Sequence, residues 1–165
     1  MPEVYIHNGP LIIGAGLAGL SVALNAAPQP TLVLAPVELG AACSSAWAQG
    51  GIAAALSPQD SPEAHAQDTL IAGAGINDPA ATHALTGMGP EVVRRLNAIG
   101  APFDHHADGS LVLNREAAHG IARVARVGGD LAGTKLLDAV VAAAKPAPPN
   151  AIRVGACATG PDQSD

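Results

Sequence analysis

Three glycines near the start of the chain have the spacing of a nucleotide-binding turn. Gly14, Gly16 and Gly19 fit the pattern G-x-G-x-x-G within the segment Gly14-Ala15-Gly16-Leu17-Ala18-Gly19. In such a turn the first glycine permits a tight reversal, the second lets the backbone approach a pyrophosphate, and the third lets the next helix pack closely on the strand. Amides at the start of that helix face the phosphate charge. The pattern predicts a dinucleotide site, and the alternative is a glycine turn kept for packing.

The acidic residue that usually binds the ribose of NAD is missing from its expected place. That residue belongs at the end of the second strand. This chain has Ala35 and Pro36 there, and Glu38 stands three positions late. The omission weakens the case for NAD and leaves FAD, whose ribose can be held in other ways.

Apolar runs on both sides of the glycines provide the elements that position them. Residues 11–13 and 31–35 are short runs rich in branched apolar residues, which is typical of buried parallel strands. Residues 20–27 are apolar at helical spacing, and Pro28 and Pro30 stop that helix. Strand, glycine turn, helix and strand make one βαβ unit. We therefore expect an α/β fold, a Rossmann-like FAD-binding domain with a parallel sheet and flanking helices.

Further start and stop signals occur along the rest of the chain. Ser61 and Asp78 each precede a proline, the pattern of an N-cap followed by the first helical residue. The signals predict helices over residues 61–72, from residue 78 onward, over 90–100 and over 133–144, a hairpin turn at Asp108-Gly109, and a strand over 151–154. Residues 37–56 lack a clear period and indicate a loop, or a loop that enters a short helix. Because residues 155–165 carry no stop signal, we expect an incomplete domain.

Composition predicts a folded chain with a thin core. The length of 165 residues fits one domain or the first part of a larger protein. Hydrophobic residues make up 48% and charged residues 13%, which argues against intrinsic disorder. Much of the apolar fraction is alanine, which buries little surface, and burial stabilises by about 25 cal/mol per Å². We therefore expect the fold to need a bound cofactor or further polypeptide.

Charge and hydropathy exclude several classes of partner. A net charge of -6 with scattered basic residues argues against nucleic acids and anionic membranes. No apolar run approaches the roughly 20 residues that span a bilayer, and residues 1–10 do not resemble a signal peptide. Cys43 and Cys157 lie far apart without metal-ligand spacing, so we expect reduced thiols. These features predict a cytoplasmic protein.

The histidines do not predict a metal site. His105 and His106 are adjacent between Asp104 and Asp108, and neighbouring side chains in a strand point to opposite faces. We therefore expect no bound metal. The other histidines before residue 100, which are His7, His65 and His83, are expected on the surface.

A segment rich in small residues follows the second strand. Its sequence is Ser44-Ser45-Ala46-Trp47-Ala48-Gln49-Gly50-Gly51-Ile52-Ala53-Ala54. This segment resembles the flavin-contacting loop of the succinate dehydrogenase and fumarate reductase flavoprotein superfamily. The resemblance implies that residues 44–51 contact FAD together with the glycine turn, and that small side chains and backbone amides let the loop run along the flavin. Trp47 is expected either beside the flavin or in the core.

Three further segments are similar to the L-aspartate oxidase family within that superfamily. They are Asp68-Thr69-Leu70-Ile71-Ala72-Gly73-Ala74-Gly75, Arg115-Glu116-Ala117-Ala118-His119, and Gly128-Gly129-Asp130 followed by Gly133. The resemblance runs from about residue 11 to 154. It implies FAD-dependent oxidation of L-aspartate to iminoaspartate, with oxygen or fumarate as electron acceptor. It also implies a place in NAD biosynthesis by way of quinolinate, with quinolinate synthase as a partner.

Two positions carry the finer implications of the resemblance. Ser44 stands where the membrane-complex dehydrogenases bond the flavin to a histidine, so non-covalent FAD is implied. Glu116 matches a glutamate that orients the substrate amino group, whereas without the resemblance it is a solvated carboxylate beside Arg115. His119 and Arg123 also fit the family segment, although the family commonly has adjacent arginines where this chain has Ala122 and Arg123.

The resemblance also implies how much of the enzyme residues 1–165 represent. They correspond to the N-terminal part of the FAD-binding domain, and the capping domain, the C-terminal helical domain and the main catalytic residues lie beyond them. We expect the isolated chain to be inactive. Two alternatives remain open, a soluble fumarate reductase-like flavoprotein and a non-catalytic, truncated nucleotide-binding fragment.

Overall fold

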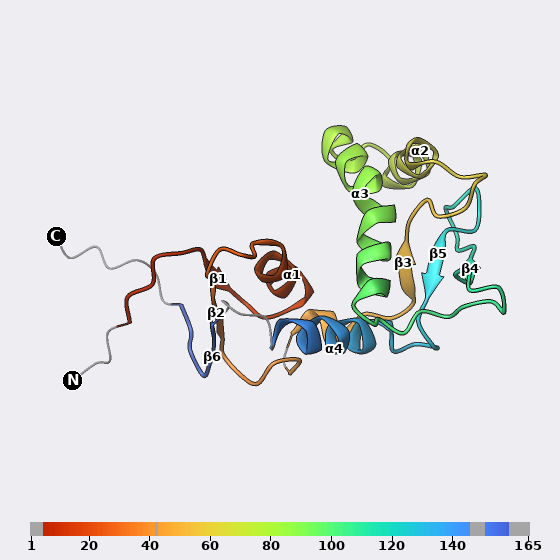
Figure 1. The fold of residues 1–165 in the computed structure, drawn as a ribbon. Helices are drawn as coiled ribbons and strands as arrows, with labels where there is room; N and C mark the ends of the chain where they lie inside the picture. Colours follow the sequence, from red (N-terminus) through yellow and green to blue (C-terminus); the bar gives the residue numbers. More distant parts are fainter. Residues whose placement is uncertain (1–4, 42, 146–150, 159–165) are drawn as a thin grey trace. The chain divides into compact units, whose positions relative to one another are not determined.

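A computed structural model describes residues 5–41, 43–145 and 151–158 of the chain (Figure 1). The chain divides into two compact units. The first contains residues 1–48 and 137–165, and the second contains residues 49–136. Each unit is described by itself.

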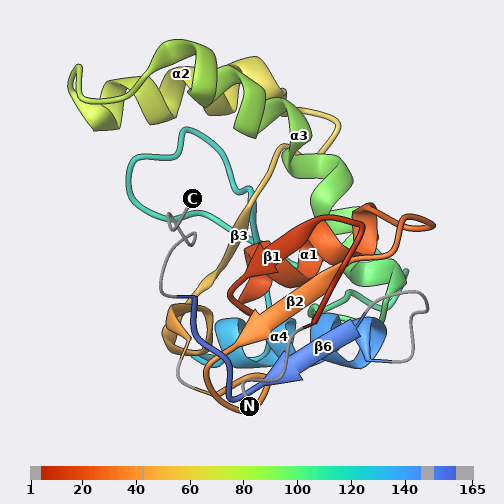
Figure 2. The ribbon, with the colours of Figure 1, turned by 90° about the vertical axis from the view of Figure 1, so that its left-hand side faces the viewer.

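The first unit is built on a parallel sheet of three strands. Its elements are β1 (Leu11–Ile13), α1 (Leu17–Asn25), β2 (Leu32–Ala35) and β6 (Ala151–Val154). The strand order is β1-β2-β6, so β2 lies in the middle (Figure 2). Leu11 pairs with Leu32 in parallel register, which confirms the predicted βαβ unit. The predicted strand over 151–154 is also confirmed.

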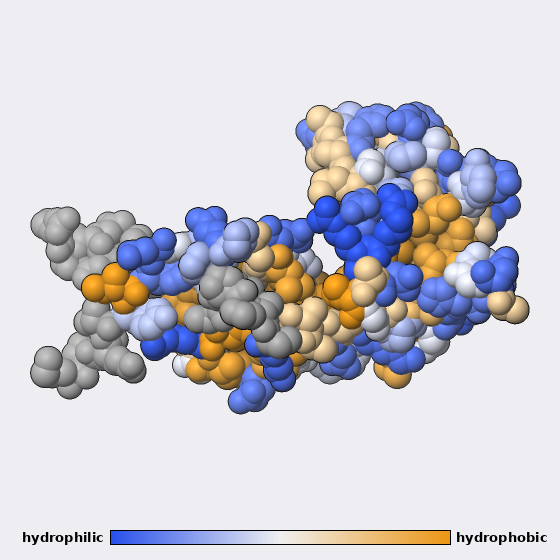
Figure 3. Space-filling view, in the orientation of Figure 1, coloured by the Kyte–Doolittle hydropathy of each residue, from blue (hydrophilic) through white to orange (hydrophobic). Residues whose placement is uncertain are grey.

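Apolar side chains of α1, of β2 and of the part of α4 (Ala132–Ala144) that belongs to this unit, from residue 137 onward, are buried. Leu20 on α1 and Val33 on β2 are fully buried. The predicted apolar residues of α4 are all buried, namely Leu137, Val140 and Val141 in this unit and Leu136 in the second. Leu11 and Ile13 on the edge strand β1 are exposed, and Figure 3 shows apolar atoms at the surface of both parts of the chain. The core is therefore thin, as the alanine content predicts.

The second unit combines a helix pair with a small antiparallel sheet. The helices are α2 (Pro62–Gly73) and α3 (Pro79–Ala98), which pack on each other. The strands are β3 (Gly51–Ala53), β5 (Val124–Arg126) and β4 (Leu113–Asn114), in the order β3-β5-β4. Strand β3 lies in a region where the sequence indicates a loop, so that expectation is wrong for these three residues. Three residues are too few to show a period, and their pairing with β5 is a contact between distant segments.

The predicted helix starts of this unit are confirmed by their caps. Ser61 Oγ accepts the backbone N–H of Ala64 at 3.0 Å, and Asp78 Oδ1 accepts that of Ala81 at 2.7 Å. Each cap replaces a hydrogen bond that the first helical turn cannot make internally. Ala74 then takes a left-handed conformation that ends α2.

The prediction of a separate helix starting at Pro90 is wrong. Pro90 lies inside α3, which continues from Pro79 to Ala98. Proline has no N–H to donate to the carbonyl four residues earlier, and this loss usually ends or bends a helix. Here Val93 is fully buried one turn later, and a Cβ at Gly89 would lie 3.3 Å from Ala54 Cβ, so α3 is closely packed on both sides of Pro90. Its ribbon changes direction partway along (Figure 2).

The remaining short features agree with their predictions. The Asp108-Gly109 turn closes a hairpin with one bridge between His105 and Leu111, and Gly109 has a φ of +85°.

No helix in the part of the chain that the structure describes is both long and apolar enough to cross a membrane.

Candidate functional site

The glycine turn of the first unit has the geometry that its spacing predicts. Gly14 has a φ of +103°, a conformation that side-chain-bearing residues rarely adopt. A Cβ at Gly16 would lie 3.2 Å from Ser45 Oγ, and a Cβ at Gly19 would collide with the carbonyl oxygen of Gly14. The N–H of Gly14 donates to Leu34 O at 2.9 Å and ties the turn to β2. The three glycines therefore serve a left-handed turn, a close approach of the loop, and close helix packing.

A pocket of about 300 Å³ opens beside this turn. It is lined by the turn, by the segment that follows β2, and by Cys43, Ser44 and Ser45. Glu38 also lines it. Glu38 stands three positions after Ala35, the last residue of β2. It nevertheless lies in the wall of the pocket, because the chain turns after Ala35. A pocket of this size is at the lower end of the range for small-molecule sites.

Ser45 joins the predicted flavin loop to the start of α1. Its Oγ accepts the backbone N–H of Leu17, the first residue of α1, at 3.1 Å. Residues Ser44–Trp47 form the short helix η1. Trp47 is 81% exposed, so the expectation that places it in the core is wrong.

In the second unit, the end of the predicted flavin loop lies near Glu116. A Cβ at Gly50 would be 3.8 Å from Glu116 Oε1, and Gly50 has a φ of +81°. Gln49, Gly50 and Gly51 belong to this unit, whereas residues 44–48 belong to the first. The structure therefore brings together two candidates, Gly50 and Glu116, that are 66 positions apart in the sequence.

Glu116 lies in a loop formed by residues 115–120, here called the Glu116 loop. Within it the N–H of His119 donates to Glu116 O at 3.2 Å, and Arg115 Nε donates to His119 O at 3.0 Å. Ala118 has a φ of +71°, a conformation in which an alanine is strained. The Glu116 side chain is exposed, as a group that meets a substrate must be before binding.

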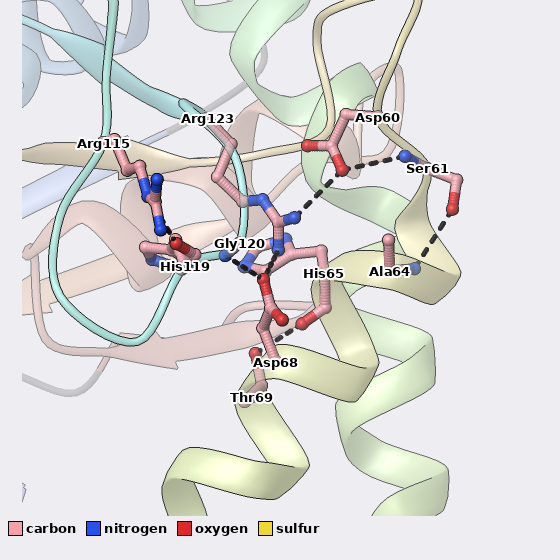
Figure 4. A network of polar contacts seen from close by, with 10 residues as sticks. All are labelled: Asp60, Ser61, Ala64, His65, Asp68, Thr69, Arg115, His119, Gly120 and Arg123. Atoms are coloured by element: carbon pink, nitrogen blue, oxygen red, sulfur yellow. Dashed lines mark hydrogen bonds and ion pairs between the residues drawn. The ribbon is translucent and has the colours of Figure 1, made fainter.

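A buried ion-pair network lies behind this loop (Figure 4). Arg123 is only 1% exposed, and its Nη2 is 3.0 Å from Asp60 Oδ1. Its Nη1 is 3.1 Å from Asp68 Oδ2, and the same oxygen accepts the backbone N–H of Gly120 at 2.6 Å. Two carboxylates thus form ion pairs with the buried guanidinium of Arg123.

The expectation that His65 lies on the surface is wrong. His65 is 8% exposed and its ring packs edge-on against that of His119, with 5.5 Å between centroids. Burial lowers the pKa of His65 from its ordinary value of 6.5, and the positive charge of Arg123 lowers the pKa further. The neutral imidazole is therefore the favoured form.

Sequence reasoning did not find the pairing of His65 and Asp68 with the Glu116 loop. A signal for it exists, because residues three positions apart lie on one face of a helix. The amide of Gly120 lowers the pKa of the Asp68 carboxyl, and Arg123 adds to this effect. No group of three or more His, Cys, Asp or Glu among the described residues is arranged to hold a metal ion.

Comparisons with known proteins agree with these features. A family model described as "FAD binding domain" matches residues 10–154. The L-aspartate oxidase of Caulobacter vibrioides is 57% identical over 152 residues, which cover 90% of this chain and 30% of that protein. The L-aspartate oxidase of Mesorhizobium japonicum is 43% identical over 141 residues, which cover 86% of this chain and 28% of that protein. The chain thus spans less than a third of the length of these relatives.

Solved structures show the same fold. A variant of the E. coli quinol fumarate reductase is 26% identical, with a TM-score of 0.81 over 87% of this chain and 25% of that one. The Sdh1 complex of Mycobacterium smegmatis in its apo form is 23% identical, with a TM-score of 0.79 over 89% of this chain and 27% of that one. These matches support the predicted Rossmann-like architecture.

Proposed function

The chain belongs to the FAD-binding domain family, and on that premise we propose that it is the N-terminal part of an L-aspartate oxidase, which oxidises L-aspartate to iminoaspartate. The observation that carries the proposal is the position of Glu116. Its carboxylate lies beside Gly50 of the flavin loop, where it can meet the ammonium group of an amino acid. The identity of 57% to the Caulobacter vibrioides enzyme supports the same assignment.

The residues of the first unit fit FAD. The turn at Gly14 and Gly16 carries no side chain toward the pocket, so a pyrophosphate can approach the backbone and the start of α1. Glu38 in the pocket wall offers carboxylate oxygens to ribose hydroxyls. Ser44 and Ser45 line the same pocket, and Ser45 is held there by its bond to Leu17. We assign these residues, with Ala15, Ala18, Gly19 and the loop residues Ala46, Trp47, Ala48, Gln49, Gly50 and Gly51, to FAD binding.

Bound FAD supplies the acceptor for the hydride that leaves C2 of aspartate. We propose that it is held without a covalent bond, because a serine at position 44 cannot form the histidyl link. Glu116 attracts the ammonium of aspartate, a group that a simple diacid lacks, so it favours aspartate over the diacid. Among the residues that the structure describes, we assign no group as acid or base at C2. We propose that the acid and base lie in the part of the enzyme that corresponds to the remaining length of the relatives, which this chain does not span.

The wider role of the protein follows from this reaction. We propose L-aspartate as substrate, oxygen or fumarate as electron acceptor, and quinolinate synthase as the enzyme that uses the product on the way to NAD. A cytoplasmic location is part of this proposal. It is supported by Cys43 and Cys157, which are free thiols and are typical of a reducing compartment.

The test uses the full-length polypeptide that carries this chain, loaded with FAD and called the holoprotein below. We expect L-aspartate to yield hydrogen peroxide in air and an imine that hydrolyses to oxaloacetate and ammonia. The likeness to fumarate reductase, with its TM-score of 0.81, favours a second candidate, a soluble fumarate reductase. That candidate is supported instead if the holoprotein reduces fumarate with a reduced dye but forms no product from aspartate.

A further inference from the structure

The Glu116 loop has little structure of its own to fix its place. Its internal bonds join Glu116, His119 and Arg115 to one another, and they hold the shape of the loop rather than its position. The N–H of Arg123 donates to Asn114 O at 3.1 Å and closes the base of the loop. Contacts outside the loop must therefore keep Glu116 beside Gly50.

Asp68 on α2 provides such a contact. Its Oδ2 accepts the amide of Gly120 at 2.6 Å and lies 3.1 Å from Arg123 Nη1. One charged oxygen thus holds the end of the Glu116 loop and the residue just before β5. A hydrogen bond to a carboxylate is stronger than one between neutral groups. A Cβ at position 120 would lie 3.3 Å from Asp68 Oδ2, so a glycine there permits the close approach.

Asp60 fixes the other side of the same arginine. The Asp60 side chain is fully buried, and its Oδ1 accepts hydrogen bonds from Arg123 Nη2 at 3.0 Å and from the backbone N–H of Ser61 at 2.9 Å. Ser61 is the N-cap of α2, so the start of α2 and the arginine share one carboxylate. Figure 4 shows Asp60 and Asp68 approaching the guanidinium of Arg123 from two sides. Removing one partner would leave a buried charge incompletely paired, which is costly.

We propose that Asp68 is a positioning residue for substrate selection. It binds no substrate itself, and it holds the Glu116 loop so that the carboxylate of Glu116 stays at the end of the flavin loop beside Gly50. This inference rests on the proposed function, since it assigns the selection of an amino acid to Glu116. The inference adds that this selection depends on the bond between Asp68 and Gly120.

Amide hydrogen exchange of the holoprotein tests the structural half of the inference. We expect Asp68→Ala to accelerate exchange at Gly120 and in the rest of the Glu116 loop by at least about tenfold, because the amide loses its partner. Asp68→Asn keeps an acceptor of the same size, so exchange should rise less. Gln67→Ala is the matched control, because this neighbour on α2 is exposed. Exchange in the Glu116 loop that is unchanged in Asp68→Ala overturns the positioning role.

Steady-state kinetics test the functional half. We expect Asp68→Asn to raise the KM for aspartate by about fivefold or more, with a smaller change in kcat and with fumarate reduction within about twofold of the unsubstituted protein. In a Glu116→Gln background the same substitution should cost little more, because the group that it positions is already neutral. A general loss of stability would lower both activities and would add to the Glu116→Gln loss.

The outcomes separate this inference from the proposed function. If the unsubstituted holoprotein oxidises no aspartate, the proposed function fails, and the role of Asp68 in selection fails with it. If aspartate is oxidised but the losses from Asp68→Asn and Glu116→Gln are additive, only the role of Asp68 is overturned.

Discussion

Ser45 Oγ accepts the backbone N–H of Leu17 at 3.1 Å across 28 positions of sequence. The bond joins the predicted flavin loop to the first residue of the helix that follows the glycine turn. Gly16 lies directly before that helix, and a Cβ there would be 3.2 Å from the same Ser45 oxygen. The absence of a side chain at Gly16 therefore lets Ser45 of the flavin loop lie close to the turn, and it also lets a phosphate approach the backbone.

Gly16→Val should strongly lower the affinity of the protein for FAD. The added side chain would push against Ser45 and would keep the pyrophosphate away from the backbone, so we expect FAD affinity to fall by at least about tenfold, or about 1.4 kcal/mol. Flavin fluorescence titration of the apoprotein measures this. Gly87→Val is the control, because Gly87 is exposed and a Cβ there meets no atom within 4 Å. Equal flavin content in the two variants would contradict the assignment of the turn.

Acid should release the flavin from the protein. With Ser44 in place of the linking histidine, the flavin is held by contacts that denaturation removes. Precipitation of the holoprotein with acid should leave a yellow supernatant and a colourless pellet. Flavin fluorescence that stays on the washed band of a denaturing gel would show a covalent bond.

Glu116→Gln should weaken aspartate oxidation selectively. The amide lacks the charge that attracts the substrate ammonium, so we expect kcat/KM for aspartate to fall by roughly tenfold or more, while fumarate reduction changes little. Glu63→Gln on the exposed start of α2 serves as the control. Equal losses of both activities in Glu116→Gln would indicate a structural role for this glutamate instead.

The stability of the second unit should fall in acid in two stages. The pKa of His65 is lowered in the fold by burial and by Arg123 and His119, with Asp60 and Asp68 opposing. Its neutral form stabilises the fold above the ordinary pKa of 6.5, and this contribution is lost as the pH falls below 6.5 toward the folded value. Asp68 has a pKa lowered below 3.8, so its contribution is lost only as the pH falls further, through its own folded value.

Denaturant unfolding of the holoprotein as a function of pH measures both stages. His65→Gln should remove the first stage, and Asp68→Asn should flatten the second. His83→Gln is the control for the first, because His83 is exposed on α3. A first stage that survives in His65→Gln would assign it to another group.

Local features of this fold are predictable from the sequence, and its long-range contacts are not. The βαβ unit and the caps at Ser61 and Asp78 depend on residues a few positions apart, so their patterns are complete within short windows. Strand β3 is three residues long and exists because it pairs with β5. Pro90 is a local stop signal that burial of the following turn at Val93 overrides.

The candidate site divides in the same way. The glycine turn is visible as a pattern, whereas the pocket position of Glu38 depends on a turn after β2 that no pattern predicts. Asp68 and Gly120 are 52 positions apart, and neither residue type by itself indicates a contact. Arg123 shows why such networks are missed, since an arginine in a loop segment is expected to face solvent and not to be buried between two carboxylates of its own chain.

Anaerobic reduction of the bound flavin by L-aspartate tests the central claim most directly. The holoprotein is mixed with L-aspartate or with succinate in the absence of oxygen, and the flavin absorbance is followed. If the chain is the N-terminal part of an L-aspartate oxidase, aspartate bleaches the yellow flavin, succinate does not, and air restores the colour. A holoprotein that binds FAD yet stays yellow with aspartate would contradict the proposed function.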